Sequence, residues 1–186
     1  MSTGETAPAD AVYVALTGRY ALVKVSGRGS FKVSSSLKQF SESVIRKALP
    51  LMLVDMTQCI GMDSTFMGVL AGVASRLKIN GGEVVLANCT TRTRGLLATL
   101  GLDQLIPAYE TADTPARYAT LMEGRDPQQE LNPAGAKDAE TVKTMLDAHQ
   151  KLVDLVPENL PQFKDVLDYL REEVQRKDKP NQSDGA

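Results

Sequence analysis

The chain has 186 residues, enough for one ordinary domain with an extension, and 42% of them are hydrophobic, which suffices for a core. A formal net charge of −2 argues against a chain-wide basic surface for nucleic acid. Two cysteines and one histidine argue against a disulfide framework, a zinc site and histidine-based catalysis. Residues 1–11 lack the features of a signal peptide, and no apolar run approaches the ~20 residues of a membrane span. We therefore expect a cytoplasmic protein that does not enter the membrane.

The first fifty residues predict two strands followed by a helix. Residues 1–10 are small and polar and are expected to be disordered. Apolar and polar side chains then alternate over residues 12–17 and 20–25, which predicts two antiparallel strands joined at Gly18-Arg19. The segment 27–32, which carries Arg28 and Lys32, is predicted to form a flexible basic loop. The helix that follows has N-cap candidates at its start and ends before a proline; the candidates are Ser34, Ser35 and Ser36.

The middle of the chain carries the most informative pattern. An apolar run at residues 51–56 predicts a strand buried on both faces, and a loop then leads to a helix that begins at Asp63-Ser64-Thr65. A second apolar strand at residues 83–88 follows, so the order predicts a parallel crossover. Glycine inside a helix is unfavourable by ~1 kcal/mol relative to alanine. Gly68 and Gly72 therefore indicate that this helix packs closely against the sheet or against a partner.

Shorter elements and a helical hairpin complete the chain. Residues 92–100 predict a short helix ended by Gly101, residues 102–107 an edge strand or turn, and residues 115–122 another short helix. Residues 123–138 have the composition of a linker. Two amphipathic helices follow within residues 139–177, and residues 178–186 are expected to be a disordered tail.

The hairpin at residues 139–177 is too small to fold well alone. It must pack on its own domain, on another protein or on a second copy, which makes it a candidate homodimer interface. His149 falls within the apolar stripe of its first helix. We interpret His149 as a packed side chain, because nothing in the sequence places it near a nucleophile.

Ser64 is the strongest candidate for a functional residue. A serine at a helix start, on the carboxyl edge of a parallel sheet, presents its hydroxyl from a rigid base. A phosphate added there meets free backbone N–H groups and the positive end of the helix. The sequence therefore predicts a phosphorylation switch at Ser64, with Thr65 as the alternative acceptor. The plain alternative is an ordinary helix start without a regulatory role.

The pattern of Met62-Asp63-Ser64-Thr65 between two apolar strands, with Gly81-Gly82 and the closing Leu100-Gly101-Leu102, resembles the STAS domain. More specifically, it resembles the bacterial anti-sigma factor antagonists over about residues 10–122. The resemblance implies an α/β fold: a mixed sheet of four to five strands flanked by helices at residues 11–122, with the hairpin as an addition. It also implies no catalytic residue, no metal and no cofactor in this chain.

In that family, the switch serine is phosphorylated by a serine kinase that is also the anti-sigma factor, and a phosphatase reverses the modification. The unphosphorylated form binds the anti-sigma factor and frees the sigma factor, so transcription is controlled without direct contact with nucleic acid. Ser64 takes the position of that serine. Residues on the helix start and in the preceding loop are the expected partner contacts: Asp63, Ser64, Thr65, Met67, Arg28, Ser30 and Lys32.

Two positions depart from the family pattern. Phe66 stands where a glycine is usual, and the loop around Ser30 is basic where an aspartate is usual. These departures and the hairpin favour an alternative, a STAS scaffold or assembly module that works without phosphorylation. A further alternative is an enzyme that uses Ser64, Cys59 or Cys89, and the lack of a histidine nearby in the sequence argues against it.

Overall fold

The structure, a computed structural model, describes residues 9–135 and 137–178. The two segments expected to be disordered, residues 1–10 and 178–186, lie almost wholly outside these ranges. Among the described residues, no helix combines the length and the apolar character needed to cross a bilayer.

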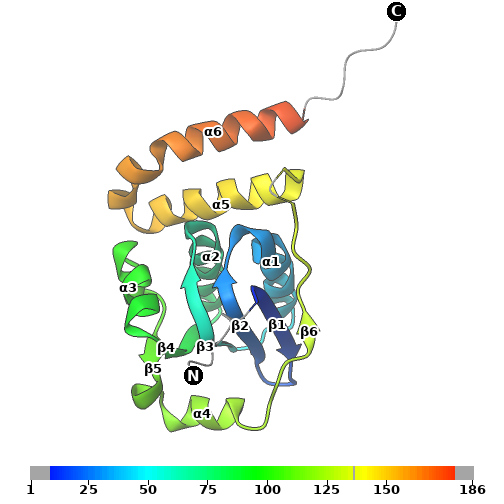
Figure 1. The fold of residues 1–186 in the computed structure, drawn as a ribbon, viewed down its shortest axis with the longest axis vertical. Coiled ribbons are helices and arrows are strands. Elements are labelled where there is room, and N and C mark those ends of the chain that lie inside the picture. Colours follow the sequence, from blue (N-terminus) through cyan, green and yellow to red (C-terminus); the bar gives the residue numbers. More distant parts are fainter. Residues whose placement is uncertain (1–8, 136, 179–186) are drawn as a thin grey trace, which may run out of the picture.

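A six-stranded sheet in the order β5-β4-β3-β2-β1-β6 forms the centre of the molecule (Figure 1). The strands are β1 (Ala11–Leu16), β2 (Ala21–Gly29), β3 (Leu51–Met62), β4 (Glu83–Cys89), β5 (Ala108–Glu110) and β6 (Gln129–Glu130). The first two are antiparallel, as predicted, and β2 to β5 run parallel. The predicted mixed sheet is thus confirmed. The sixth strand, β6, comes from the expected linker, pairs with β1 and was not predicted.

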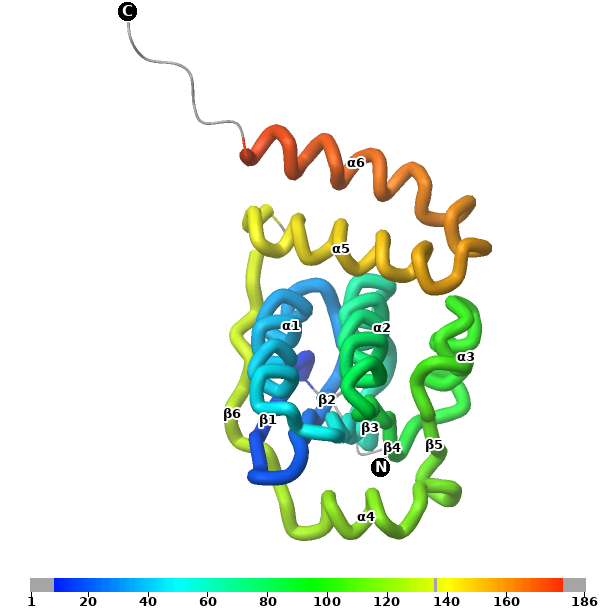
Figure 2. The backbone as a smooth tube through the Cα atoms, turned by 180° about the vertical axis from the view of Figure 1, so that it is seen from behind, coloured from blue at the N-terminus to red at the C-terminus, as the bar shows by residue number. Residues whose placement is uncertain are grey.

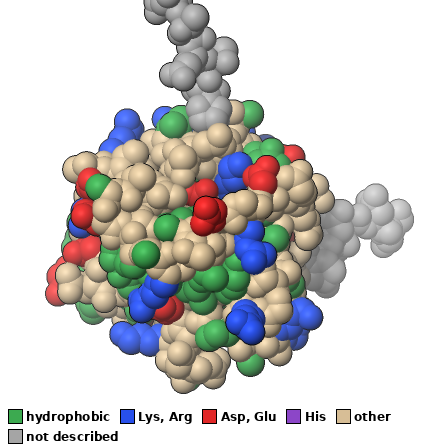
Figure 3. Space-filling view, turned by 90° about the horizontal axis from the view of Figure 1, so that it is seen from below, with side chains coloured by type: hydrophobic (Ala, Val, Ile, Leu, Met, Phe, Trp, Pro, Cys, Tyr) green, Lys and Arg blue, Asp and Glu red, His purple; other side chains and the backbone are tan. Residues whose placement is uncertain are grey.

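Helices cover both faces of the sheet. The helices of this part are α1 (Phe31–Arg46), α2 (Ser64–Ile79), α3 (Thr91–Thr99) and α4 (Ala116–Met122). The main core lies between the sheet and α1 and α2, whereas α4 packs Tyr118 against the opposite face. The α4 end of the molecule, seen from below in Figure 3, mixes hydrophobic, basic and acidic side chains. That surface therefore shows no concentration of one charge.

Three predicted boundaries are wrong for one shared reason. The expected flexible loop at residues 27–32 is the end of β2 and the start of α1, so the serines at 34–36 lie inside that helix. Strand β3 continues six residues beyond the predicted strand, to Met62. Parallel pairing of Arg28 with Gly61 and of Gly29 with Met62 extends both strands. These pairs join distant parts of the chain, so local sequence does not reveal them.

The C-terminal hairpin packs on its own domain. It consists of α5 (Ala139–Leu155) and α6 (Leu160–Asp178), and α5 crosses α1 and α2 at the end of the molecule where β2 and β3 reach their carboxyl ends (Figures 1 and 2). A Cβ at Gly68 would lie 2.6 Å from the carbonyl oxygen of Ala148. The predicted close packing is confirmed at Gly68, but the neighbour is α5 of the same chain and not the sheet or a partner. Gly72 has no such close neighbour, since a Cβ there would lie 3.8 Å from the Lys151 side chain.

The elbow of the hairpin, which is the turn Pro157–Asn159 between α5 and α6, is fixed to the end of α3. The buried Asn159 donates hydrogen bonds from Nδ2 to the carbonyl oxygens of Leu100 (3.1 Å) and Leu152 (3.2 Å). Val156 packs over Gly101, whose φ of 67° lies in the left-handed region that favours glycine. These contacts fix where α5 lies across α2.

Candidate functional site: the start of helix α2

Asp63 holds the starts of two helices at once. One carboxylate oxygen accepts a hydrogen bond from the backbone N–H of Phe66 in α2 (2.8 Å), and the other accepts from the N–H of Phe31 in α1 (2.7 Å). Its own N–H donates to the carbonyl oxygen of Gly29 (3.0 Å). A negative charge at the positive ends of two helices is favourable. Asp63 therefore fixes the position of Ser64, the first residue of α2.

Phe66 completes this rigid base. Its ring is fully buried, and its Cδ1 and Cε1 lie 2.7 Å from where a Cβ on Gly29 would stand. The end of β2 thus needs a glycine because a phenylalanine occupies the first turn of α2. The departure at Phe66 is accommodated by this packing and leaves the start of α2 regular.

Ser64 contacts the C-terminal hairpin. Its Oγ lies 2.9 Å from Nε2 of His149, and His149 Nδ1 lies 2.8 Å from the carbonyl oxygen of Met145. A carbonyl only accepts, so the neutral imidazole carries its proton on Nδ1, and Nε2 accepts from the Ser64 hydroxyl. The His149 ring also packs in a T-shaped arrangement with Phe163 of α6, with centroids 4.9 Å apart.

Burial keeps His149 neutral. The side chain is 4% exposed, and this desolvation lowers the pKa of His149 below its ordinary value. The hydrogen bond to Met145 and the charge of Asp63 act in the opposite direction but are smaller. The Ser64 hydroxyl therefore faces a neutral base that can accept its proton.

The other predicted site residues lie on two segments that meet at Asp63, but they are exposed unequally. Arg28 and Lys32 are exposed and Ser30 is half-buried, beside the hydrogen bonds that Gly29 and Phe31 make with Asp63. Thr65 and Met67, by contrast, are buried in the first turn of α2. As α5 is placed, these two present little surface to a partner.

His149 is the residue that sequence reasoning missed. Its burial confirms the interpretation of His149 as a packed side chain, but the 2.9 Å contact corrects the expectation that it lies away from Ser64. The one signal was indirect: Gly68, a turn after Ser64, indicated a closely packed neighbour. No sequence pattern named α5 as that neighbour.

The cysteines lack the exposure of reactive thiols. Cys59 lies within β3 and Cys89 ends β4, and both are buried. Burial raises the pKa of Cys59, and it raises the pKa of Cys89 to about 11. Both are therefore protonated near neutral pH. No group of three or more metal-ligating side chains is found among the described residues.

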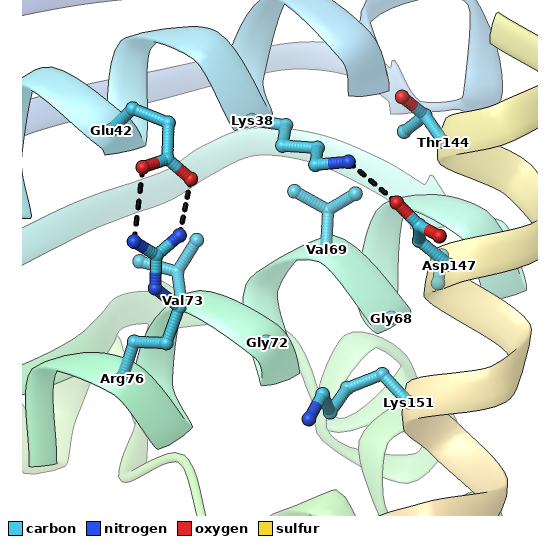
Figure 4. A pocket seen from close by; sticks show the side chains of 11 residues that line it. Lys38, Glu42, Gly68, Val69, Gly72, Val73, Arg76, Thr144, Asp147 and Lys151 are labelled. Atoms are coloured by element: carbon cyan, nitrogen blue, oxygen red, sulfur yellow. Dashed lines mark hydrogen bonds and ion pairs between the residues drawn. The ribbon is translucent and has the colours of Figure 1, made fainter. Parts of the chain in front are cut away.

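A small groove lies beside the contact between α2 and α5. It encloses about 150 Å³ between α1, α2 and α5, with Gly68 and Gly72 on α2 facing Lys151 on α5 (Figure 4). Lys38 of α1 pairs with Asp147 of α5 at 2.7 Å. Beside the groove, Gly68 of α2 lies against Ala148 of α5.

Comparison with known proteins places the domain. A model of the STAS domain family matches residues 13–114, more than half of the chain, and α5 and α6 lie outside that match. No curated protein sequence matches. The chain is similar to the structure of the anti-sigma factor antagonist SpoIIAA in its unphosphorylated form, with 15% identity and a TM-score of 0.50 over 62% of this chain and 98% of that chain.

Two further structures are similar at the same level. Bacillus SpoIIAA in the phosphorylated form has 14% identity and a TM-score of 0.47, over 59% of this chain and 96% of that chain. The Thermotoga maritima protein TM1081 has 14% identity and a TM-score of 0.49, over 61% of this chain and 88% of that chain. Only the match to unphosphorylated SpoIIAA, with a TM-score of 0.50, speaks for a shared fold, and at 15% identity it speaks for the fold alone.

Proposed function

The chain belongs to the STAS domain family, and from that premise we propose that it is a protein-binding regulator of the anti-sigma factor antagonist type, gated by phosphorylation of Ser64. The observation that carries the proposal is the place of Ser64. It is the first residue of α2, fixed by the double cap of Asp63 at the carboxyl edge of the parallel strands. In open α/β sheets, binding sites form at this edge.

The physical effect of a phosphate there is sufficient for a switch. A phosphoserine carries about −1.5 to −2 charges and accepts hydrogen bonds from free N–H groups of the first helical turn. Attraction to the helix end is only about 0.3–1 kcal/mol in exposed settings, so the domain keeps its fold. Repulsion of an acidic partner group ~6 Å away reaches about 5 kcal/mol at an effective dielectric near 20. Binding is then lost while the domain remains intact.

The proposed partners are those that the resemblance to the anti-sigma factor antagonists implies. A serine kinase that is also the anti-sigma factor binds unmodified Ser64 and phosphorylates it with its own ATP, and a phosphatase restores the hydroxyl. The exposed Arg28 and Lys32 beside Asp63 favour an acidic surface on that partner. The chain then acts in cytoplasmic signal transduction, by binding and not by catalysis.

Mass spectrometry of the intact chain tests the proposal. The wild-type protein is incubated with ATP and each serine kinase of its source organism, beside Ser64→Ala and Thr65→Ala. We expect the wild type and Thr65→Ala to gain one phosphoryl group and Ser64→Ala to gain none. A mass gain that survives Ser64→Ala, or no gain with any kinase, contradicts the proposal.

One observation favours a scaffold that works without phosphorylation: α5 covers the start of α2, and His149 contacts Ser64. The two functions separate when Ser64→Ala and Ser64→Asp are compared for binding to the same partner. A switch binds the partner through Ser64→Ala and loses it in Ser64→Asp, whereas a scaffold treats the two variants alike.

The contact between Ser64 and His149 also has the geometry of a nucleophile and its base. An acyl-transfer enzyme is therefore a second candidate. Hydrolysis of p-nitrophenyl acetate, compared between wild type and Ser64→Ala, distinguishes it. Turnover that disappears in Ser64→Ala would favour the enzyme, and equal background rates favour the binding function.

A further inference from the structure

The face of α5 that lies on the domain is unusually polar for a buried surface. Thr141 and Thr144 are each 1% exposed, and their hydroxyl oxygens have no hydrogen-bond partner among the described residues. His149 is buried on the same helix. A buried polar group without a hydrogen-bond partner destabilises the closed state, because the same group bonds to water once it is exposed. This interface therefore loses less on separation than an apolar interface of the same size.

Apolar contacts nevertheless keep the hairpin closed at rest. Leu152 is fully buried, and Phe163 and Leu167 of α6 belong to the same core. The hairpin is thus seated by a few apolar side chains at the elbow end of α5. Its polar stretch, around Thr141 and Thr144, lies at the other end.

A phosphate on Ser64 is incompatible with the hydrogen bond that closes the hairpin onto this residue. The 2.9 Å between Ser64 Oγ and His149 Nε2 leaves no room for a phosphorus atom and its oxygens between the two side chains. A small shift of α5 along α2 does not make room, because Gly68 and Ala148 are already in close contact. Ser64 is half-buried, so α5 restricts the approach of a kinase or a partner to Oγ while the hairpin is closed.

We propose that the α5–α6 hairpin is an intramolecular competitor, in which α5 occupies the surface of α1, α2 and Ser64 that a partner protein binds. This inference rests on the proposed function and adds a regulatory step to it. The partner class is read from α5 itself: a protein that presents an amphipathic helix. That helix has a small residue opposite Gly68, where Ala148 now lies, and an acidic residue opposite Lys38, where Asp147 now lies.

A thiol at position 64 measures the opening without any partner. In the full chain carrying Ser64→Cys, the rate of modification by a maleimide reports access to this position. The native Cys59 and Cys89 are buried, and the chain without the substitution gives their background rate. Thr99→Cys, on the exposed end of α3, gives the rate of an uncovered thiol.

Two glycines of α2 provide a matched pair of variants. Gly68→Ala places a methyl group 2.6 Å from the Ala148 carbonyl and pushes α5 away. Gly72→Ala meets nothing closer than the Lys151 side chain at 3.8 Å, and it gains the same helix propensity. We expect Gly68→Ala to speed modification about tenfold or more, as overpacking of an interface shifts an opening equilibrium. Gly72→Ala leaves the rate unchanged.

His149→Ala gives a second opening variant without a clash, and it covers the case in which Gly68→Ala fails to fold. Folding is checked by a cooperative thermal transition and by Cys59 and Cys89 remaining unreactive. We expect faster modification in His149→Ala as well. Equal rates in all folded variants, or a starting rate already equal to that of Thr99→Cys, overturn the inference. The phosphorylation experiment is repeated with the opening variants Gly68→Ala and His149→Ala, which separates the two failures. No phosphoryl gain in a variant whose thiol probe is fast counts against the switch, whereas equal thiol rates count against the cover.

Discussion

Ser64 is held from two sides, and the two sides differ in kind. From within the domain, Asp63 caps α2 and α1 through two hydrogen bonds to backbone N–H groups. From outside, His149 reaches Ser64 from a hairpin that lies beyond the match to the family. The Asp63 contacts belong to the architecture of the sheet edge, whereas the His149 contact depends on how α5 packs.

The difference teaches which part of the site is fixed and which part can change. Removing Asp63 leaves two helix starts without a cap, so the domain itself loses stability. Removing His149 leaves the helix start intact and uncovers a hydroxyl. A switch needs both properties: a rigid position for the modified residue and a way to control access to it.

The largest effect expected is on the seating of the hairpin. Leu152→Ala removes a fully buried side chain between α5 and the domain and should lower the free energy of unfolding by about 3 kcal/mol. Urea denaturation measures this loss. Leu160→Ala, at the exposed start of α6, should cost less than about 0.5 kcal/mol. Equal losses in the two variants would mean that the hairpin is not seated as described.

Asp63→Ala should lower the free energy of unfolding by about 2 kcal/mol, because two helices lose a cap at once. Asp138→Ala is the matched control, since Asp138 caps α5 alone, through one exposed hydrogen bond of 3.3 Å. Its expected cost is about 0.5 kcal/mol. Denaturation curves that rank the two variants in the opposite order would refute the double cap.

Acid should loosen the hairpin through His149. The groups that face it are the Ser64 hydroxyl, the Asp63 carboxylate, the Met145 carbonyl and the Phe163 ring. Burial lowers the pKa of His149 in the closed state, so the open state binds the proton more tightly. The stabilisation of the closed hairpin by neutral His149 is complete above the ordinary pKa of about 6.5. It is lost as the pH falls through the lower pKa that His149 has in the closed state.

Hydrogen exchange of α5, measured from about pH 7.5 down to about 5.5 and corrected for intrinsic rates, reports this loss. Protection should fall with pH, by no more than about 1.4 kcal/mol per pH unit. His149→Gln should abolish the dependence in this range. A pH dependence that persists in His149→Gln would assign the effect to another group.

The smallest effect concerns the rim of the groove between α1, α2 and α5. Arg76 binds Glu42 through its two terminal guanidinium nitrogens, and this hydrogen bonding lowers the pKa of Glu42 (Figure 4). Both side chains are partly exposed. Arg76→Ala should therefore cost only about 0.5 kcal/mol, and the difference should vanish at about 1 M salt. A loss that resists salt would place the pair deeper in the fold than described.

The sequence predicts those elements of the fold whose signals lie in neighbouring residues. Alternation at residues 12–17 marks β1, the apolar run at Leu51 marks β3, and Asp63 before a helical stripe marks the start of α2. Gly68 even predicts a close neighbour, because its cost inside a helix has to be offset by packing. Each of these signals lies within a few residues of the feature that it predicts.

The misses are all contacts between distant segments. The backbone N–H of Phe31, at the start of α1, donates its hydrogen bond to the distant Asp63. The serines at 34–36 lie inside α1 and do not have the capping role that the local sequence predicts. The contact between Ser64 and His149 spans 85 residues and depends on where the hairpin docks. A stripe of apolar residues shows that α5 packs somewhere, and the docking face follows only from the assembled tertiary structure.

Mass spectrometry of the chain purified from its own cells tests the central claim most directly. Trypsin releases residues 48–76 as one peptide, because no lysine or arginine lies between Lys47 and Arg76. The account predicts a phosphorylated form of this peptide, with fragment ions that place the phosphate on Ser64 and not on Thr65. A peptide found only unmodified across growth and stress conditions, or modified elsewhere, would contradict it.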